Sequence, residues 1–114
     1  MEKEIAIPKE KAAEVAAVLR LLSNEKRLLI LCHLAQEGEV SVTPLARLVG
    51  LSQSALSQHL ARLREDKLVS TRRDSQVLYY RIADDRVGRI LSALYEIYCT
   101  DTATGAPKRV EGPS

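Results

Sequence analysis

The sequence predicts a single, mainly α-helical domain that carries one β-hairpin. The chain has 114 residues and a mass of 12.6 kDa, which suits one domain because most domains contain about 100 to 150 residues. Its four aromatic residues are all tyrosines, so the core must be built from leucine, valine, isoleucine and alanine. Apolar residues recur at helical spacing over most of the chain, and only residues 69–81 alternate with a period of two.

Two helices are expected in the first third of the chain. The first covers residues 9–22, where the apolar positions at helical spacing are Val15, Val18, Leu19 and Leu22. The second covers about residues 24–36, with Ser23 or Asn24 as its cap and Gly38 at its end. Its apolar stripe is Leu28, Leu31, Cys32 and Ala35.

Two further helices follow in close succession. The segment Ser41-Val42-Thr43-Pro44 offers a hydroxyl cap and then proline at the first helical position of a short helix that ends at Gly50. The turn Gly50-Leu51-Ser52 supplies a new cap for a helix over about residues 53–66. The buried stripe of that helix is Leu56, Leu60 and Leu63. Two helices joined by so short a turn are typical of a helix-turn-helix.

The last part of the chain predicts a hairpin and one more helix. Residues 69–73 and 77–81 alternate as strands around the polar tip Asp74-Ser75-Gln76. Asp84 or Asp85 caps a helix over about residues 85–99, whose apolar stripe is Val87, Ile90, Leu91, Leu94, Ile97 and Tyr98. We expect residues 1–8 to be flexible and residues 101–114 to be disordered. Residues 9–100 then form a winged helix-turn-helix with an extra helix at each end.

Positive charge is concentrated in the middle of the chain. Residues 43–81 carry seven Lys/Arg against three Asp/Glu, a net charge of +4, whereas residues 1–42 and 82–114 are each −1. Burial of the leucine stripe of the helix over residues 53–66 leaves short polar side chains outward, which suit contacts with base edges. We therefore predict an interface for double-stranded DNA made of Gln53, Ser54, Ser57, Gln58, His59, Arg62, Arg72, Arg73, Gln76 and Arg81. For any single arginine, solvation of a sheet edge is the alternative.

The first and last helices carry more apolar surface than one small subunit needs. A wide apolar stripe on a terminal helix is most simply buried against its copy in a second subunit. The expected interface of this homodimer consists of Val15, Val18, Leu19, Leu91, Leu94, Tyr95 and Tyr98. The two recognition helices of such a dimer would lie about 34 to 36 Å apart and read an inverted repeat.

Other classes of protein fit the sequence poorly. The most apolar run, residues 28–35, is far shorter than the roughly 18 residues that a membrane span needs, and no apolar segment follows the first four residues as in a signal peptide. We expect a cytoplasmic protein whose two cysteines, Cys32 and Cys99, are reduced. The cysteines do not form a Cys-x-x-Cys motif, and no catalytic constellation is evident. Neither an enzyme nor a cofactor is expected.

Three stretches of the chain resemble the ArsR (ArsR/SmtB) family of bacterial repressors. They are LSNEKRL at residues 22–28, LSQSALSQHL at 51–60 with LRE at 63–65, and the hairpin with TRR at 71–73 and YYRI at 79–82. The resemblance covers residues 15–99. It implies a dimeric winged helix-turn-helix repressor that leaves its operator when it senses an inducer.

The sequence departs from the metal-sensing patterns of that family. Many members bind metal through paired cysteines in the third helix or through His and Asp on the last helix. Residues 44–49 contain no cysteine and residues 85–99 contain no histidine. Cys32 and His33 are adjacent and would point about 100° apart on a helix. No metal site is therefore expected.

The placement of the cysteines is similar to the persulfide-responsive BigR/SqrR subgroup of the family, in which extra sulfur atoms bridge two cysteines. The resemblance implies this role for Cys32 and Cys99, with inorganic or organic persulfides as inducers. A disulfide needs Cα atoms within about 4.4 to 6.8 Å, and each inserted sulfur adds up to about 2 Å of reach. Two thiols held slightly too far apart for a disulfide would therefore still accept a trisulfide or a tetrasulfide.

Several alternatives stay open at this point. Cys32 taken alone could be an apolar core residue, and His33 could either lower the pKa of Cys32 or simply face solvent. Within the repressor class, the alternatives are a general thiol-redox sensor that forms a disulfide and a metal-responsive regulator. Outside that class they are a thiol oxidoreductase and a winged-helix module that binds only protein.

Overall fold

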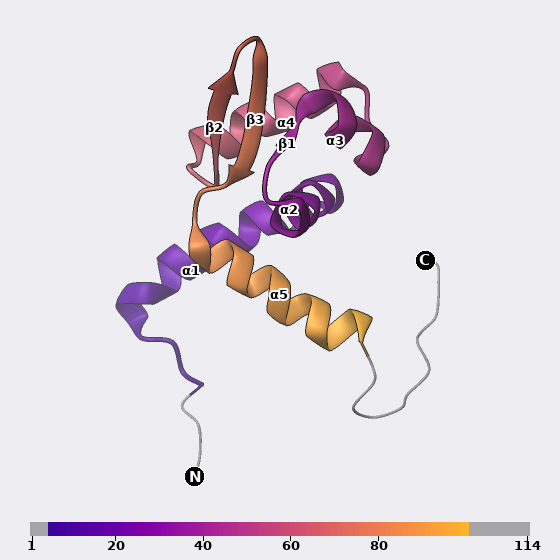
Figure 1. Cartoon of the computed structure of the whole chain (residues 1–114). Helices are drawn as coiled ribbons and strands as arrows, with labels where there is room; N and C mark the ends of the chain where they lie inside the picture. Colours follow the sequence, from indigo (N-terminus) through magenta and orange to yellow (C-terminus); the bar gives the residue numbers. More distant parts are fainter. Residues whose placement is uncertain (1–4, 101–114) are drawn as a thin grey trace.

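The computed structural model describes residues 5–100 (Figure 1). The helix-turn-helix and the strands lie on one side of α2, whereas α1 and α5 lie on its other side (Figure 1). This is a winged helix-turn-helix, as the sequence predicts, and the β2–β3 hairpin is the wing. The expected tail, residues 101–114, and the first four residues lie outside the described part of the chain. The elements are α1 (Lys9–Leu22), α2 (Glu25–Glu37), β1 (Val40–Ser41), α3 (Val42–Val49), α4 (Gln53–Glu65), β2 (Val69–Asp74), β3 (Val77–Ile82) and α5 (Asp85–Cys99).

Most of the expected caps are present. Asn24, Ser52 and Asp84 each accept a hydrogen bond from a backbone N–H in the first turn of α2, α4 and α5, respectively. Each cap satisfies a backbone donor that has no partner inside its helix. Ser23 has a different role, because its hydroxyl donates to the carbonyl of Arg20 at 2.8 Å and so belongs to the end of α1.

The prediction for the start of α3 was wrong by two residues. The helix begins at Val42, so Pro44 is its third residue and not its first. Ser41 precedes the helix, but its side chain makes no capping hydrogen bond. The proline is tolerated because the N–H groups of the first turn have no acceptor within the helix. Gly50 ends α3 in the left-handed conformation, with φ of 71°, where glycine is favoured.

The sheet has one more strand than the sequence predicts. The strand order is β1-β3-β2, and the two-residue β1 pairs antiparallel with β3, placing Val40 opposite Tyr80 and Ser41 opposite Tyr79. Two residues are too few to show a period of two, so this strand can be recognised only from its partner. The pairing attaches the wing to the segment between α2 and α3.

A leucine-rich core holds these elements together. In α2 the buried residues are Ile30, Leu31 and Leu34, whereas Cys32 and Ala35 are exposed. The expected stripe of α2 was therefore wrong at Cys32 and Ala35, and correct at Leu31. The stripe of α4 is confirmed, since its three leucines are fully buried. The core consists of Leu22, Ile30, Leu31, Leu34, Val40, Leu45, Ala46, Val49, Leu56, Leu60, Leu63, Leu68, Val69, Val87 and Leu91.

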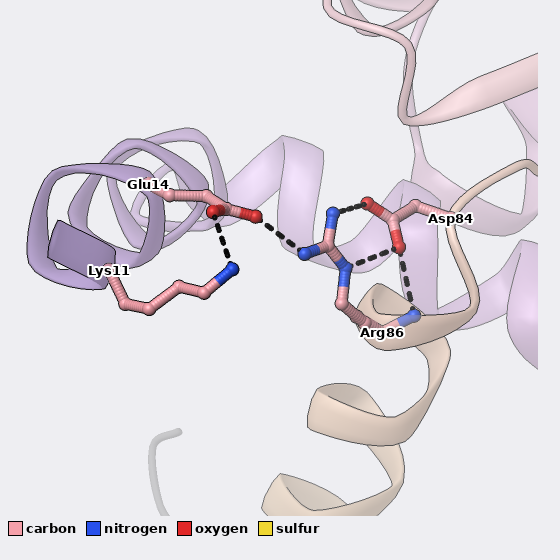
Figure 2. Close-up of polar contacts among 4 residues, drawn as sticks. All are labelled: Lys11, Glu14, Asp84 and Arg86. Carbon is pink, nitrogen blue, oxygen red and sulfur yellow. Dashed lines mark hydrogen bonds and ion pairs between the residues drawn. The ribbon is translucent and has the colours of Figure 1, made fainter. Parts of the chain in front are cut away.

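An ion-pair network joins α1 to the start of α5 (Figure 2). The guanidinium of Arg86 donates to Glu14 Oε2 on α1 at 2.6 Å and to both carboxylate oxygens of Asp84 at 3.0 and 3.1 Å. Hydrogen bonds from Arg86 are the main reason that the pKa values of the Glu14 and Asp84 carboxyls lie below their usual range. The same two carboxylates raise the pKa of Arg86, chiefly through Asp84. Arg86 thus ties α1 to the residue that caps α5.

Replacing Arg86 with Gln should lower the urea midpoint of unfolding at about pH 7 and change it little at about pH 2. The carboxyls of Glu14 and Asp84 ionise more readily in the folded chain. Their pairing with Arg86 therefore stabilises the fold fully above their ordinary pKa values of 4.5 and 3.8 and is lost as the pH falls through the lowered values. The measurement is urea unfolding at both pH values. Arg89→Gln, also on α5, is the control, and an equal loss at both pH values would contradict an electrostatic role.

Candidate nucleic-acid interface and thiol pair

The helix-turn-helix exposes one polar face of α4. Burial of Leu56, Leu60 and Leu63 fixes the rotation of this helix about its axis. The opposite face therefore points away from the core, as predicted. On it, Gln53, Ser54, Ser57, Gln58 and Arg62 are exposed, and His59 is half-buried.

Two side chains of this face already have partners within the subunit. The amide of Gln53 donates to the hydroxyl of Thr43 on α3 at 3.1 Å, which links the two helices of the motif. Arg62 pairs with Asp66 at 3.0 Å, one turn further along. The residues best placed to contact a ligand at the start of α4 are therefore Ser54, Ser57 and Gln58.

The arginines of the wing lie at different positions along its two strands. Arg73 and Gln76 are exposed near the tip, where Ser75 takes a positive φ of 59° in the turn. Arg81 lies near the base, opposite Ser70, and its Nε donates to the Ser70 hydroxyl at 3.4 Å. All three wing arginines are exposed, but Arg73 lies near the tip and Arg81 near the base.

Glu39 is the residue of this region that the sequence analysis missed. Its carboxylate accepts hydrogen bonds from the Nε and Nη2 atoms of Arg72 at 2.8 to 3.2 Å, and these bonds are the main reason that its pKa is lowered. The guanidinium of Arg72 also lies over the Tyr79 ring, 4.9 Å from its centroid. Nothing in the linear sequence signals this pair, because the partners are brought together by the pairing of β1, β3 and β2. Part of the positive charge of the wing is thereby neutralised.

Cys32 and Cys99 lie on α2 and α5, two helices that contact each other. Both are exposed and neither forms a disulfide. Partial burial raises the pKa of the Cys32 thiol, and the charge of Cys99 raises it further. Cys32 is exposed to solvent. The alternative that Cys32 is an apolar residue of the core is therefore wrong.

The described residues show neither a metal site nor a membrane span. Within residues 5–100, no three side chains of His, Cys, Asp or Glu gather in a way that could hold a metal ion. In the same range, every helix is too short or too polar to cross a bilayer.

Apolar side chains are exposed along α1 and α5. Leu19 on α1 is 51% exposed, and Tyr95 and Tyr98 on α5 are 60% and 76% exposed. Ile97, which was not among the expected interface residues, is 68% exposed on the same helix. Val15, Val18 and Leu94 are half-buried. Leu91 belongs to the core of the subunit and is only 4% exposed, so it leaves little surface for a partner.

A helix-turn-helix with a polar recognition face and a wing defines a DNA-binding regulator of transcription, and comparison with known proteins identifies its family. A family model described as bacterial regulatory protein, arsR family, matches residues 24–71. The nodulation protein NolR of Rhizobium meliloti is 56% identical over 82% of this chain and 77% of its own. The biofilm growth-associated repressor of Agrobacterium fabrum is 43% identical over 84% of this chain and 83% of its own.

Solved structures agree with this family. The crystal structure of the transcriptional repressor BigR from Xylella fastidiosa is 40% identical, superposes with a TM-score of 0.75, and covers 82% of this chain and 94% of that one. The chain belongs to the arsR family of bacterial regulatory proteins.

The Cys32 thiol should react slowly with iodoacetamide at neutral pH and faster as the pH rises beyond the usual thiol range. Only the thiolate is nucleophilic, and burial together with the charge of Cys99 raises the pKa of Cys32. Replacing Cys99 with Ser should lower that pKa without restoring the ordinary value, because the contribution of burial remains. The rate is measured at Cys32 by peptide mass spectrometry across a pH series. The urea-unfolded protein is the control, and the same midpoint in folded and unfolded protein would contradict the raised pKa.

Proposed function

We propose that the protein is a homodimeric repressor that binds inverted-repeat operator DNA with both thiols reduced. It releases the DNA when a persulfide links Cys32 and Cys99 through a polysulfide bridge. The observation that carries the proposal is the exposure of two thiols on α2 and α5, two helices that contact each other. Two relatives support repression, since one is named a biofilm growth-associated repressor and the other the repressor BigR.

The DNA contact is argued from the polar face of α4 and from the tip of the wing. Ser54, Ser57 and Gln58 are exposed beside the N-terminus of a helix, where backbone N–H groups also favour phosphate. Gln suits the donor and acceptor pattern of adenine in the major groove. Arg73 at the tip of the wing adds a contact to the DNA backbone. In this arrangement α4 reads the bases and the wing supplies charge.

The dimer is argued from the exposed apolar surface of α1 and α5. Leu19, Tyr95, Ile97 and Tyr98 expose large apolar side chains that a second copy of the chain would cover. A two-fold axis through these helices would bring the two α4 helices to successive major grooves. The operator is therefore an inverted repeat.

The chemistry of release needs no oxidant other than the persulfide. A cysteine thiolate attacks the outer sulfur of a persulfide RSSH, which yields a protein persulfide and the thiol RSH. When both cysteines carry an added sulfur, the persulfide of one attacks the cysteine sulfur of the other and displaces H₂S. Two RSSH and two protein thiols give one trisulfide, two RSH and one H₂S. All sulfur and hydrogen atoms are accounted for.

The length of the bridge favours selectivity for persulfide over peroxide. A bridge that includes added sulfur tolerates a longer separation between Cys32 and Cys99 than a direct disulfide does. Peroxide alone can form only the direct disulfide, so a longer separation favours added sulfur over peroxide-driven closure.

The bridge acts on DNA affinity because it joins two parts of the subunit with different roles. Cys32 lies on α2, which packs in the body of the DNA-binding unit, and Cys99 ends α5, which carries the candidate dimer surface. A bridge changes the angle between the two α4 helices or stiffens the dimer. Either effect needs only a few kcal/mol of difference between the open and bridged states, which is about a tenfold to several-hundredfold change in affinity.

Exposure of the reduced protein to persulfide should add the mass of a sulfur bridge and lower operator affinity at least about tenfold. Cys32→Ser and Cys99→Ser each remove one end of the bridge. Both variants should therefore keep DNA binding in the presence of persulfide. Intact mass spectrometry and gel shifts measure the two effects on the same samples.

Separate treatments with peroxide, zinc and a small disulfide are the controls for this experiment. Release by peroxide or by the disulfide would favour a general thiol-redox repressor, and release by zinc would favour a metal-responsive one. A Cys99→Ser protein that still responds to persulfide would rule out a two-thiol mechanism.

The affinity for an operator selected from random DNA should fall steeply with salt, with a slope near −5 for a dimer that neutralises about three phosphates per subunit. Gln58→Ala should reduce the preference for the operator over scrambled DNA about tenfold, because it removes a base contact. Arg73→Gln should weaken binding to both DNAs equally and make the slope shallower by about 1 per subunit. Fluorescence anisotropy across a salt series measures these effects. Absence of any salt-dependent DNA binding would favour a module that binds only protein.

A further inference from the structure

A groove runs beside Cys32 between α2, the base of β3 and α5. Its volume is about 580 Å³, which lies in the range of small-molecule sites. Cys32 lines the groove from α2, Arg81 and Ile82 line it from β3, and Asp85, Gly88 and Leu91 line it from α5. One of the two proposed reactive thiols therefore opens into a concave surface and not onto a flat face.

Gly88 lines the groove from α5 and places no side chain in it. A glycine inside a helix destabilises it relative to alanine, so its presence calls for a reason. Close packing is not the reason, because a Cβ atom added at Gly88 would meet no atom within 4 Å. A side chain at this position would instead occupy the groove. The glycine is explained if the groove must stay open.

The groove also contains a pair of opposite charges. Arg81 and Asp85 both line it, and among residues 5–100 neither forms an ion pair, whereas the neighbouring Arg72 and Arg86 each form two. The contact of Arg81 with Ser70 uses only its Nε atom, at 3.4 Å, which leaves the two terminal nitrogens of the guanidinium for a ligand. A guanidinium binds a carboxylate, and a carboxylate binds an ammonium group.

Arg81 and the Cys32 thiol line different parts of the groove, which are separated along the axis of α2. Arg81 and Gly38 line the same groove, and the pairing of Val40 with Tyr80 places the end of α2 beside the base of β3. Gly38 follows Cys32 by six residues, which is about 9 Å of helix at 1.5 Å per residue. A chain of two or three amino acids spans such a distance at about 3.3 to 3.6 Å per residue.

We propose that this groove binds a low-molecular-weight peptide persulfide, with its carboxylate on Arg81, its ammonium group on Asp85 and its outer sulfur at Cys32. This inference rests on the proposed function and names the substrate class of the same site. Cys32 attacks the outer sulfur of the bound RSSH, the S–S bond breaks, and the peptide leaves as RSH while Cys32 becomes a persulfide. Binding holds the two sulfur atoms together, which compensates for the small thiolate fraction of Cys32.

The test measures transfer of one sulfur atom to Cys32 by intact mass in a Cys99→Ser background, in which no bridge can form. The probes are glutathione persulfide, its N-acetylated diethyl ester, and 2-hydroxyethyl persulfide, which is small and neutral. With glutathione persulfide, Arg81→Gln and Asp85→Asn should each slow the transfer about fivefold. Gly88→Leu, which fills the groove, should slow it more. The ester and 2-hydroxyethyl persulfide should react at the same rate with the Arg81 and Asp85 variants as with their parent.

Arg89→Gln on α5, outside the groove, is the matched control and should react like the parent protein. Thermal unfolding of each variant verifies that the fold is intact, and the readout is independent of DNA binding. Equal rates for glutathione persulfide with the parent, Arg81→Gln, Asp85→Asn and Gly88→Leu would overturn the groove while leaving the thiol mechanism intact. If Cys32 accepts sulfur from none of the three probes, the proposed function fails and the inference fails with it.

Discussion

The rotation of α2 about its own axis is the constraint on which the thiol pair depends. Ile30, Leu31 and Leu34 are fully buried, and their burial fixes which face of the helix meets the core. Cys32 follows Leu31 directly and so points about 100° away from it, out of the core and toward α5. A helix turned by one residue would bury the sulfur among leucines and leave Cys99 without a partner. The same leucine core that holds the helix-turn-helix together therefore also places the thiol.

The wing illustrates how tertiary pairing redistributes charge that the sequence presents as a single basic segment. Of the three arginines on its strands, Arg72 is held by Glu39 and Arg81 lies at the base. Arg73 remains exposed near the tip. One arginine thus attaches the wing to Glu39, the residue before β1, and a second borders a groove. Charge counted along the chain overstates the charge that the wing can offer to a polyanion.

α5 serves three purposes with different faces. Val87 and Leu91 complete the core, Arg86 joins the helix to α1, and Tyr95 and Tyr98 expose large apolar side chains. Gly88 leaves space on the side that faces α2. Because Cys99 ends this helix, a covalent link from Cys99 to α2 connects the core, the candidate dimer surface and the groove. A small change at the sulfur atoms can therefore reach all three.

The sequence by itself determined the order and type of the main elements, the buried face of α4 and the polar residues opposite it. These follow from periodicity and capping, which are local properties of the chain. The two-residue β1, the Glu39–Arg72 pair, the exposure of Cys32 and the groove beside it were decided only by the tertiary structure. The apolar residues of α2 fit more than one helical face, so periodicity alone placed Cys32 on the buried side. Which face is buried depends on the shape of the elements that pack against it, and residues far apart in the chain meet only after those elements have assembled.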